Sequence, residues 1–172
     1  MAHDPAHGHS ALRRGRFSQS GAGYFLTIGT VGKDIGLTDS GIAGAILTEA
    51  KAMSADGTWS LRCAVVMPDH LHLLIELGSR LPLAKAVQRL KAKTSTTLRS
   101  GELQWARGFF DRKLRPDDEL LSLFLYIYLN PYRAGLATLS QSWAQYYCGE
   151  EDWSWFRELL DQERPVPAWL SL

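Results

Sequence analysis

The sequence contains few cysteines, no long hydrophobic run and almost no net charge. Its two cysteines, Cys63 and Cys148, form no CxxC motif, which argues against a disulfide framework or a cysteine-based structural zinc site. No stretch reaches the roughly 18 consecutive apolar residues that span a bilayer, and the polar N-terminal residues lack the apolar segment of a signal peptide. We therefore expect a soluble cytoplasmic protein without a membrane partner.

The charges that are present are unevenly distributed along the chain. The formal net charge is +1, from 19 basic and 18 acidic residues, and this total gives no indication of a nucleic-acid partner. Residues 1–79 contain 6 basic and 7 acidic residues, residues 80–115 contain 10 and 2, and residues 116–172 contain 3 and 9. A polyanion could bind the basic middle segment, although cations that only solvate helix surfaces would give the same pattern.

Length and composition suit one globular domain with a hydrophobic core. The chain has 172 residues, of which 45% are hydrophobic and 22% charged, and this excludes a fibre or a disordered chain. We predict a flexible basic arm over residues 1–20, one main domain over 21–148 and a short acidic helical extension over 149–172.

Hydrophobic patterns predict alternating strands and helices in the main domain. Strands are expected at residues 24–30, 59–67, 70–77 and, as a short extended piece, 108–114. Helices are expected from Asp39 or Ser40 onward, from Pro82 to about Ser100, and from Pro116 to just before Pro131. This βαββαβ order predicts a ferredoxin-like α+β fold, a sheet with helices on one face, followed by a C-terminal helix bearing Tyr126 and a short helical tail.

The segment VVMPDHLHLLIEL places two histidines on a predicted strand. One residue separates His70 from His72, so both imidazoles point to the same face, about 6.6 Å apart along the strand. Two neutral imidazoles on one face can share a divalent cation. Two histidines on a half-solvated strand without a metal would show the same pattern.

A second group of polar residues ends the helix predicted before Pro131. Tyr126 and Asn130 lie one turn apart on the same helical face, whereas Tyr128 points away and is expected to pack in the core. A phenol, whose pKa is ordinarily near 10, can attack a phosphate when a divalent cation polarises the phosphoryl oxygens. Tyr126 could equally be an amphipathic core residue.

These segments together resemble the REP-associated tyrosine transposases, a family of HUH single-tyrosine transposases. The resemblance runs from about Arg13 to Tyr147 and is carried by RRGRFSQSGAGYFLTIGT, VVMPDHLHLLIEL, QRLKAKTSTTLR, WARGFFDRKLRPDDEL and YIYLNPYRAGL. It implies that residues 21–148 form a catalytic domain, that His70 and His72 bind Mg²⁺ or Mn²⁺ with Asn130 as a third ligand, and that Tyr126 is the nucleophile.

The implied reaction is cleavage and rejoining of single-stranded DNA beside a hairpin of a repeated extragenic palindrome. Tyr126 would form a 5′-phosphotyrosine and release a 3′-hydroxyl. By the same resemblance, we expect a nucleoid-associated monomer. Two alternatives remain open: a protein that binds hairpin DNA or RNA without cutting it, and a metal-dependent phosphodiesterase that uses water as the nucleophile.

If the partner is DNA, the basic residues acquire a role as phosphate contacts. The predicted DNA-binding residues are Arg13, Arg14 and Arg16 of the arm, Lys85, Arg89, Lys91 and Lys93 of the long helix, and Arg112, Lys113 and Arg115 after it. Trp105 and Phe109 are candidates for stacking on bases, although core packing is their more frequent use.

Overall fold

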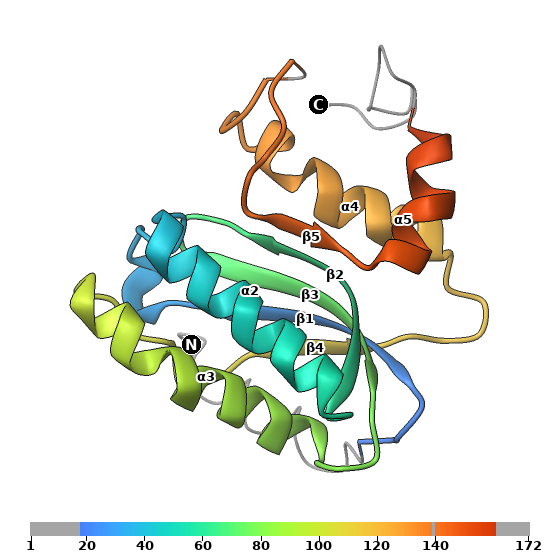
Figure 1. The fold of residues 1–172 in the computed structure, drawn as a ribbon, viewed down its shortest axis with the longest axis horizontal. Helices are drawn as coiled ribbons and strands as arrows, with labels where there is room; N and C mark the ends of the chain where they lie inside the picture. Colours follow the sequence, from blue (N-terminus) through green and yellow to red (C-terminus); the bar gives the residue numbers. More distant parts are fainter. Residues whose placement is uncertain (1–17, 139, 161–172) are drawn as a thin grey trace, which may run out of the picture.

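The computed structural model describes residues 18–138 and 140–160. They form a five-stranded antiparallel sheet with helices packed on it (Figure 1). The strands are β1 (Gly23–Gly29), β2 (Trp59–Val66), β3 (His70–Leu77), β4 (Phe110–Lys113) and β5 (Tyr146–Cys148). They lie in the order β4-β1-β3-β2-β5, and every neighbouring pair is antiparallel. The predicted α+β class is confirmed, and β1 to β4 follow the predicted βαββαβ order along the chain.

Helices cover both faces of this sheet (Figure 1). On one face lie α2 (Ser40–Ala55) and α3 (Leu83–Ser100), and against the other lie α4 (Leu120–Arg133) and α5 (Glu150–Phe156). Two short 3-10 helices, η1 (Val31–Lys33) and η2 (Arg157–Leu159), complete the helical elements of the described residues. None of the helices in residues 18–138 and 140–160 is long and apolar enough to cross a membrane.

Local signals explain where α2 begins and which side of it is buried. The Asp39 carboxylate accepts hydrogen bonds from the backbone N–H groups of Gly41 (2.9 Å) and Ile42 (3.2 Å), as the predicted N-cap should. The buried residues of α2 follow helical spacing: Ile42, Ala43, Ile46, Ala50 and Met53. They hold α2 against the sheet.

Alternation along the strands divides the core into two clusters. Leu26, Ile28, Ala64, Leu73 and Ile75 are among the strand residues that face α2 and α3. Phe25, Cys63, Val65 and Leu74 face the other way, where they pack with α4 and α5. β2 and β3 are therefore buried on both sides. The second cluster packs α4 against the face of the sheet that also carries the histidines.

The predicted boundaries of the tyrosine-bearing helix were wrong at both ends. The helix begins at Leu120 rather than Pro116, because the Asp118 side chain accepts a hydrogen bond from the Arg115 backbone N–H (2.7 Å) and stabilises a turn there. It also continues through Pro131 to Arg133. Proline removes one backbone donor from a helix, but Pro131 is buried and the neighbouring Tyr132 anchors this last turn in the second cluster.

β5 was not predicted, and it places the two cysteines side by side. In the pairing of β2 with β5, Cys63 lies directly opposite Cys148. Both are free thiols in the structure. Burial raises the pKa of the Cys63 thiol well above its ordinary value.

The described part of the C-terminal extension packs onto the main domain. Asp152 in α5 accepts hydrogen bonds from Arg62 in β2, at 3.0 Å to Nε and 2.5 Å to Nη2. Phe156 is fully buried among the aromatic residues of α4 and α5. Residues 1–17 of the predicted arm and residues 161–172 of the extension lie outside the described part of the chain.

Candidate active site

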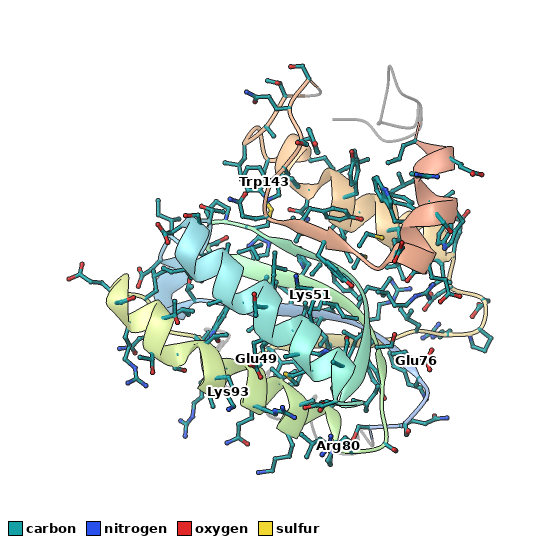
Figure 2. The ribbon with its side chains drawn as sticks, in the orientation of Figure 1. Glu49, Lys51, Glu76, Arg80, Lys93 and Trp143 are labelled. Atoms are coloured by element: carbon teal, nitrogen blue, oxygen red, sulfur yellow. The ribbon has the colours of Figure 1, made fainter. Side chains whose placement is uncertain are left out.

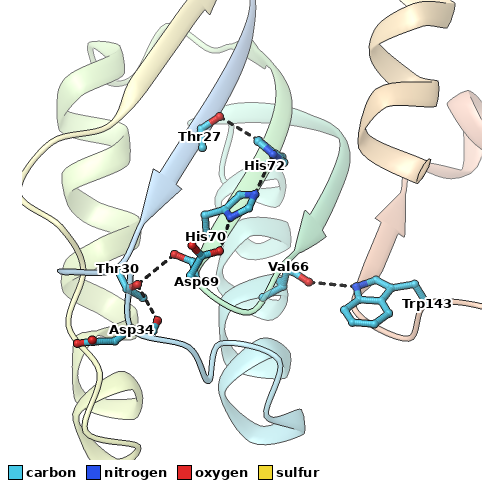
Figure 3. Close-up of polar contacts among 8 residues, drawn as sticks. All are labelled: Thr27, Thr30, Asp34, Val66, Asp69, His70, His72 and Trp143. Atoms are coloured by element: carbon cyan, nitrogen blue, oxygen red, sulfur yellow. Dashed lines mark hydrogen bonds and ion pairs between the residues drawn. The ribbon is translucent and has the colours of Figure 1, made fainter. Parts of the chain in front are cut away.

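The two histidines lie on β3, on the face of the sheet that α4 partly covers. In the strand register His72 lies opposite Thr27 of β1 and Val65 of β2. The imidazoles of His70 and His72 point toward each other, and their Nε2 atoms are 3.1 Å apart (Figure 3). The spacing predicted that both imidazoles lie on the same face, and in the structure the rings also converge.

Two further side chains fix the orientation of these rings (Figure 3). The Asp69 carboxylate lies 2.6 Å from Nδ1 of His70; because a carboxylate can only accept, this contact turns Nδ1 toward Asp69 and leaves Nε2 facing His72. On the other ring, the Thr27 hydroxyl is hydrogen-bonded to Nδ1 of His72 at 2.9 Å. The turn that precedes β3 is held by Thr30, whose hydroxyl donates to the Asp69 carbonyl (3.1 Å).

His72 is buried and uncharged at neutral pH. Only 4% of the residue is exposed. Burial, and after it the nearby His70, lowers the pKa of His72 to about 3. A neutral imidazole is the form that binds a divalent cation.

The histidine pair fits the requirements of a small divalent cation. Two adjacent ligands of an octahedral ion at about 2.1 Å would be separated by roughly 3.0 Å, close to the 3.1 Å between the Nε2 atoms. Within the described residues, no group of three or more His, Cys, Asp or Glu side chains gathers to hold a metal. Asparagine is not among these four residue types, and the half-buried Asn130 of α4 remains the predicted third ligand.

α4 brings Tyr126 to the histidines. The phenol ring lies 5.5 Å from the His72 ring and 5.7 Å from the Phe25 ring, measured between centroids. Tyr126 remains 38% exposed, so it is accessible to a large substrate. Tyr128 points away and packs against Tyr146 and other aromatic residues, as predicted, and burial raises its pKa to about 12.

Several residues at this site were not predicted from the sequence. Arg133 places its guanidinium 5.7 Å from the centroid of the Tyr126 ring. The two residues are seven apart, so they share a helical face, but the helix was predicted to end before Pro131. Thr27 and Phe25 also contact His72, and the Phe25 ring stacks on it at 5.2 Å. These contacts depend on the register between β1 and β3, which hydrophobic alternation alone does not reveal.

The basic residues of α3 are not close to the histidines, because α3 lies on the opposite face of the sheet (Figure 1). Arg89 forms an ion pair with Asp56 and donates to the Thr58 hydroxyl (3.1 Å). Lys91 donates to the backbone carbonyls of Ala106 (2.8 Å) and Gly108 (2.7 Å). Lys85 donates to Gln88 (3.3 Å), and Lys93 is exposed on the same helix (Figure 2). Arg89 and Lys91 thus hold the fold together.

One cation of β4 lies on the histidine face of the sheet. Arg112 lies opposite Phe25, on the histidine face, and is paired with Asp118. Lys113 donates to Gln19 (2.5 Å), and Arg115 is exposed. The other predicted cations, Arg13, Arg14 and Arg16, lie outside the described residues.

The two aromatic residues predicted as stacking candidates pack instead on the core beneath α3. Trp105 is partly buried and its indole N–H donates to the Thr94 hydroxyl (2.8 Å). Phe109 is also partly buried in that cluster, and the Lys91 ammonium lies 5.8 Å from its ring centroid.

Comparison with known proteins identifies a related family and a related fold. Residues 37–114 match the family model described as "Transposase IS200 like". The solved structure of a REP-associated tyrosine transposase bound to a REP hairpin has a similar fold, with a TM-score of 0.59 and 19% identity over 71% of this chain and 73% of that one. A second structure, assigned as a transposase of Deinococcus radiodurans R1, gives a TM-score of 0.48 and 18% identity over 73% of this chain and 98% of that one. No curated protein matches significantly.

The family match covers the two histidines but ends before α4. The assignment of Tyr126 therefore depends on its position beside His72. These comparisons agree with the resemblance inferred from the sequence: residues 37–114 match the IS200-like transposase family model, and the fold is similar to that of a REP-associated tyrosine transposase.

Proposed function

We propose that this protein is a metal-dependent transesterase that cleaves and rejoins single-stranded DNA beside a palindromic hairpin. The observation that carries the proposal is the contact between Tyr126 of α4 and His72 of β3, with ring centroids 5.5 Å apart. Two elements distant in the sequence bring a phenol to a converging imidazole pair. The similarity of residues 37–114 to IS200-like transposases supports the same chemistry.

In the proposed reaction the Tyr126 oxygen attacks the scissile phosphorus. The phenol gives up its proton as the new phosphorus–oxygen bond forms the 5′-phosphotyrosine, while the bond to the 3′-oxygen breaks and that oxygen takes up a proton and leaves as a hydroxyl, so no net proton is gained or lost. The step exchanges one phosphodiester for another, so no nucleotide hydrolysis is required, and attack by the 3′-hydroxyl of a DNA strand reverses it. The chain's sequence agrees, since it contains no P-loop motif.

His70, His72 and Asn130 would hold Mg²⁺ or Mn²⁺, which supplies Lewis-acid polarisation of the scissile phosphate. Asp69 and Thr27 keep the two imidazoles in place. Arg133, beside the Tyr126 ring, contributes a positive charge where the attacked phosphate must lie.

The proposed substrate is single-stranded DNA beside a hairpin. A neighbour of similar fold is described as bound to a REP hairpin, and single-stranded DNA beside a hairpin is the substrate we propose for this chain. Arg112, on the histidine face, is the predicted cation best placed to bind its phosphates near the site, while Lys113, Arg115 and, on α3, Lys85 and Lys93 would contact parts of the DNA that extend past the edge of the sheet. The active site is formed within one chain, so we propose a monomer in the nucleoid.

A covalent adduct tests the proposal. The protein is incubated with labelled hairpin DNA carrying single-stranded flanks and Mn²⁺, then denatured and separated by electrophoresis. We expect a denaturation-resistant adduct that is lost in Tyr126→Phe and in the presence of a chelator. Tyr128→Phe is the matched control, because it removes a hydroxyl from the same helix on the side that faces the core, and it should keep the adduct.

Each alternative gives a different result in this experiment. Cleavage that persists in Tyr126→Phe would identify water as the nucleophile and contradict the phosphotyrosine. Binding without cleavage in the wild-type protein would indicate a protein that recognises the hairpin without cutting it.

A further inference from the structure

The most exposed aromatic residue of the described chain lies on the histidine face of the sheet. Phe110 is 57% exposed, and Tyr126, the proposed nucleophile, is the other aromatic residue among the exposed large hydrophobic side chains of residues 18–138 and 140–160. Single exposed hydrophobic residues are common on protein surfaces. Here, however, the two exposed rings share one face.

The strand register places Phe110 in line with His72. Thr27 of β1 lies directly opposite both Phe110 of β4 and His72 of β3. Directly paired residues of antiparallel strands point to the same side, and the hydrogen bond between Thr27 and His72 fixes which side this is. Since neighbouring strands are about 4.8 Å apart, the Cα atoms of Phe110 and His72 are separated by roughly 10 Å.

A cation accompanies the exposed ring on this face. Arg112 lies two residues after Phe110 and opposite Phe25, whose ring stacks on His72. Phe109, the preceding residue, packs into the cluster on the opposite face, below α3, so the strand presents only one of its two adjacent phenylalanines here. An aromatic platform next to a cation is the combination that proteins use to bind single-stranded nucleic acid, by base stacking and phosphate contact.

β4 is an outer strand of the sheet, so another strand could also approach it. The residues that follow Phe110 oppose this, because Asp111, Arg112 and Lys113 are all charged, and charged edge strands resist pairing with a second chain. A nucleotide of single-stranded DNA offers the face of its base to the ring and its phosphate to the arginine. We propose that Phe110 is a stacking site for one unpaired base of the single-stranded DNA, close to the phosphate that Tyr126 attacks; this rests on the proposed function.

Binding measurements test this stacking site. Affinity for a fluorescent hairpin oligonucleotide with single-stranded flanks is measured by anisotropy in a Tyr126→Phe background, where the DNA stays intact. Loss of one base–aromatic stack weakens binding by about 5- to 150-fold, and this is expected for Phe110→Ala and for Phe110→Leu, which keeps an apolar side chain. Phe110→Trp should retain the affinity. Ile35→Ala, which truncates a 75% exposed apolar residue in the loop after η1, is the control and should bind normally.

An abasic scan identifies the base. Each flanking nucleotide is replaced in turn by an abasic one, and the affinity ratio of the parent protein to Phe110→Ala is measured for each oligonucleotide. We expect this ratio to fall to about one at a single position, because the stack is already absent there. A ratio that is the same at every position, or an unchanged affinity in Phe110→Ala, would overturn the proposal. A change in oligomeric state in Phe110→Ala would instead indicate that a second copy covers the ring, and would also overturn it.

The results separate this inference from the proposed function. An adduct in the wild-type protein, together with full affinity in Phe110→Ala, would refute only the stacking site. Abasic coupling without any adduct would support the stacking site and refute the transesterase. Failure of the wild-type protein to bind the oligonucleotide would refute both.

Discussion

Truncation of Phe156 in α5 should destabilise the whole domain and displace the helix that carries Tyr126. Phe156 is completely buried. Its ring contacts Phe124 and Tyr128 of α4 at centroid distances of 5.4 and 5.7 Å, and Trp153 and Trp155 of its own helix at 6.0 Å each. Replacement of a buried phenylalanine by alanine costs about 3–5 kcal/mol. Four aromatic neighbours place Phe156→Ala toward the upper end of that range.

The loss can be measured in two ways. Urea denaturation should show a free energy of unfolding lower by about 3–5 kcal/mol, and calorimetry should show a melting temperature lower by about 6–20 °C, at 2–4 °C per kcal/mol for a chain of this size. Phe110→Ala is the matched control, since it removes the same ring from a 57% exposed position and should change stability by less than about 1 kcal/mol.

A small effect in Phe156→Ala would refute the reasoning. If the free energy of unfolding fell by less than about 1 kcal/mol, α5 would be an appendage that unfolds separately and does not support α4. The Tyr126 adduct should weaken together with stability, because α4 loses the surface against which it packs.

Two further predictions concern carboxylates near the ends of strands. Asp69→Asn should weaken Mn²⁺ binding, measured by calorimetry, by about 10- to 100-fold, because the hydrogen bond that orients His70 loses its charged acceptor; Asp34→Asn, an exposed carboxylate beside the same turn, should bind normally, and equal affinities would contradict the orienting role. A hydrogen bond from Thr58, and after it Arg89, lowers the pKa of Asp56 to about 2; since the folded pKa lies below the unfolded one, this stabilisation is present above about pH 4 and is lost toward pH 2. The free energy of unfolding should therefore depend less steeply on pH in Asp56→Asn over that interval, and an identical pH dependence would exclude the linkage.

Local sequence signals were sufficient for most of the fold. The Asp39 cap, the turn at Pro68 and Asp69, and the alternation around His70 and His72 each depend on a few neighbouring residues, and the structure has them where predicted. The same local reasoning placed Tyr128 in the core, because a helical period of 100° separates it from Tyr126. These features are determined by interactions within one or two turns of chain.

Features determined by distant contacts were not predicted. Proline is a local signal to end a helix, yet α4 continues through Pro131 because Tyr132 is buried and its hydroxyl donates to the Gln141 carbonyl (2.9 Å). β5 has only three residues, too few for a period to be recognised, and its pairing with β2 was not evident from either strand alone. Both features depend on which surfaces of α4 and β2 meet in the folded protein.

Charge gave the least reliable guide to the site, because sequence does not show which cations are used inside the fold. Arg89 and Lys91 contribute to the basic middle segment, yet they bind Asp56 and the carbonyls of the loop after α3. The face opposite α3 instead combines two imidazoles, a phenol, an exposed phenylalanine and the guanidinium groups of Arg112 and Arg133. Alternation along β3 and β4 assigns the histidines, Phe110 and Arg112 to the same face of the sheet, and α4 brings Tyr126 and Arg133 to that face. The register of three strands, more than the number of basic residues, therefore indicates where a single strand of DNA would lie.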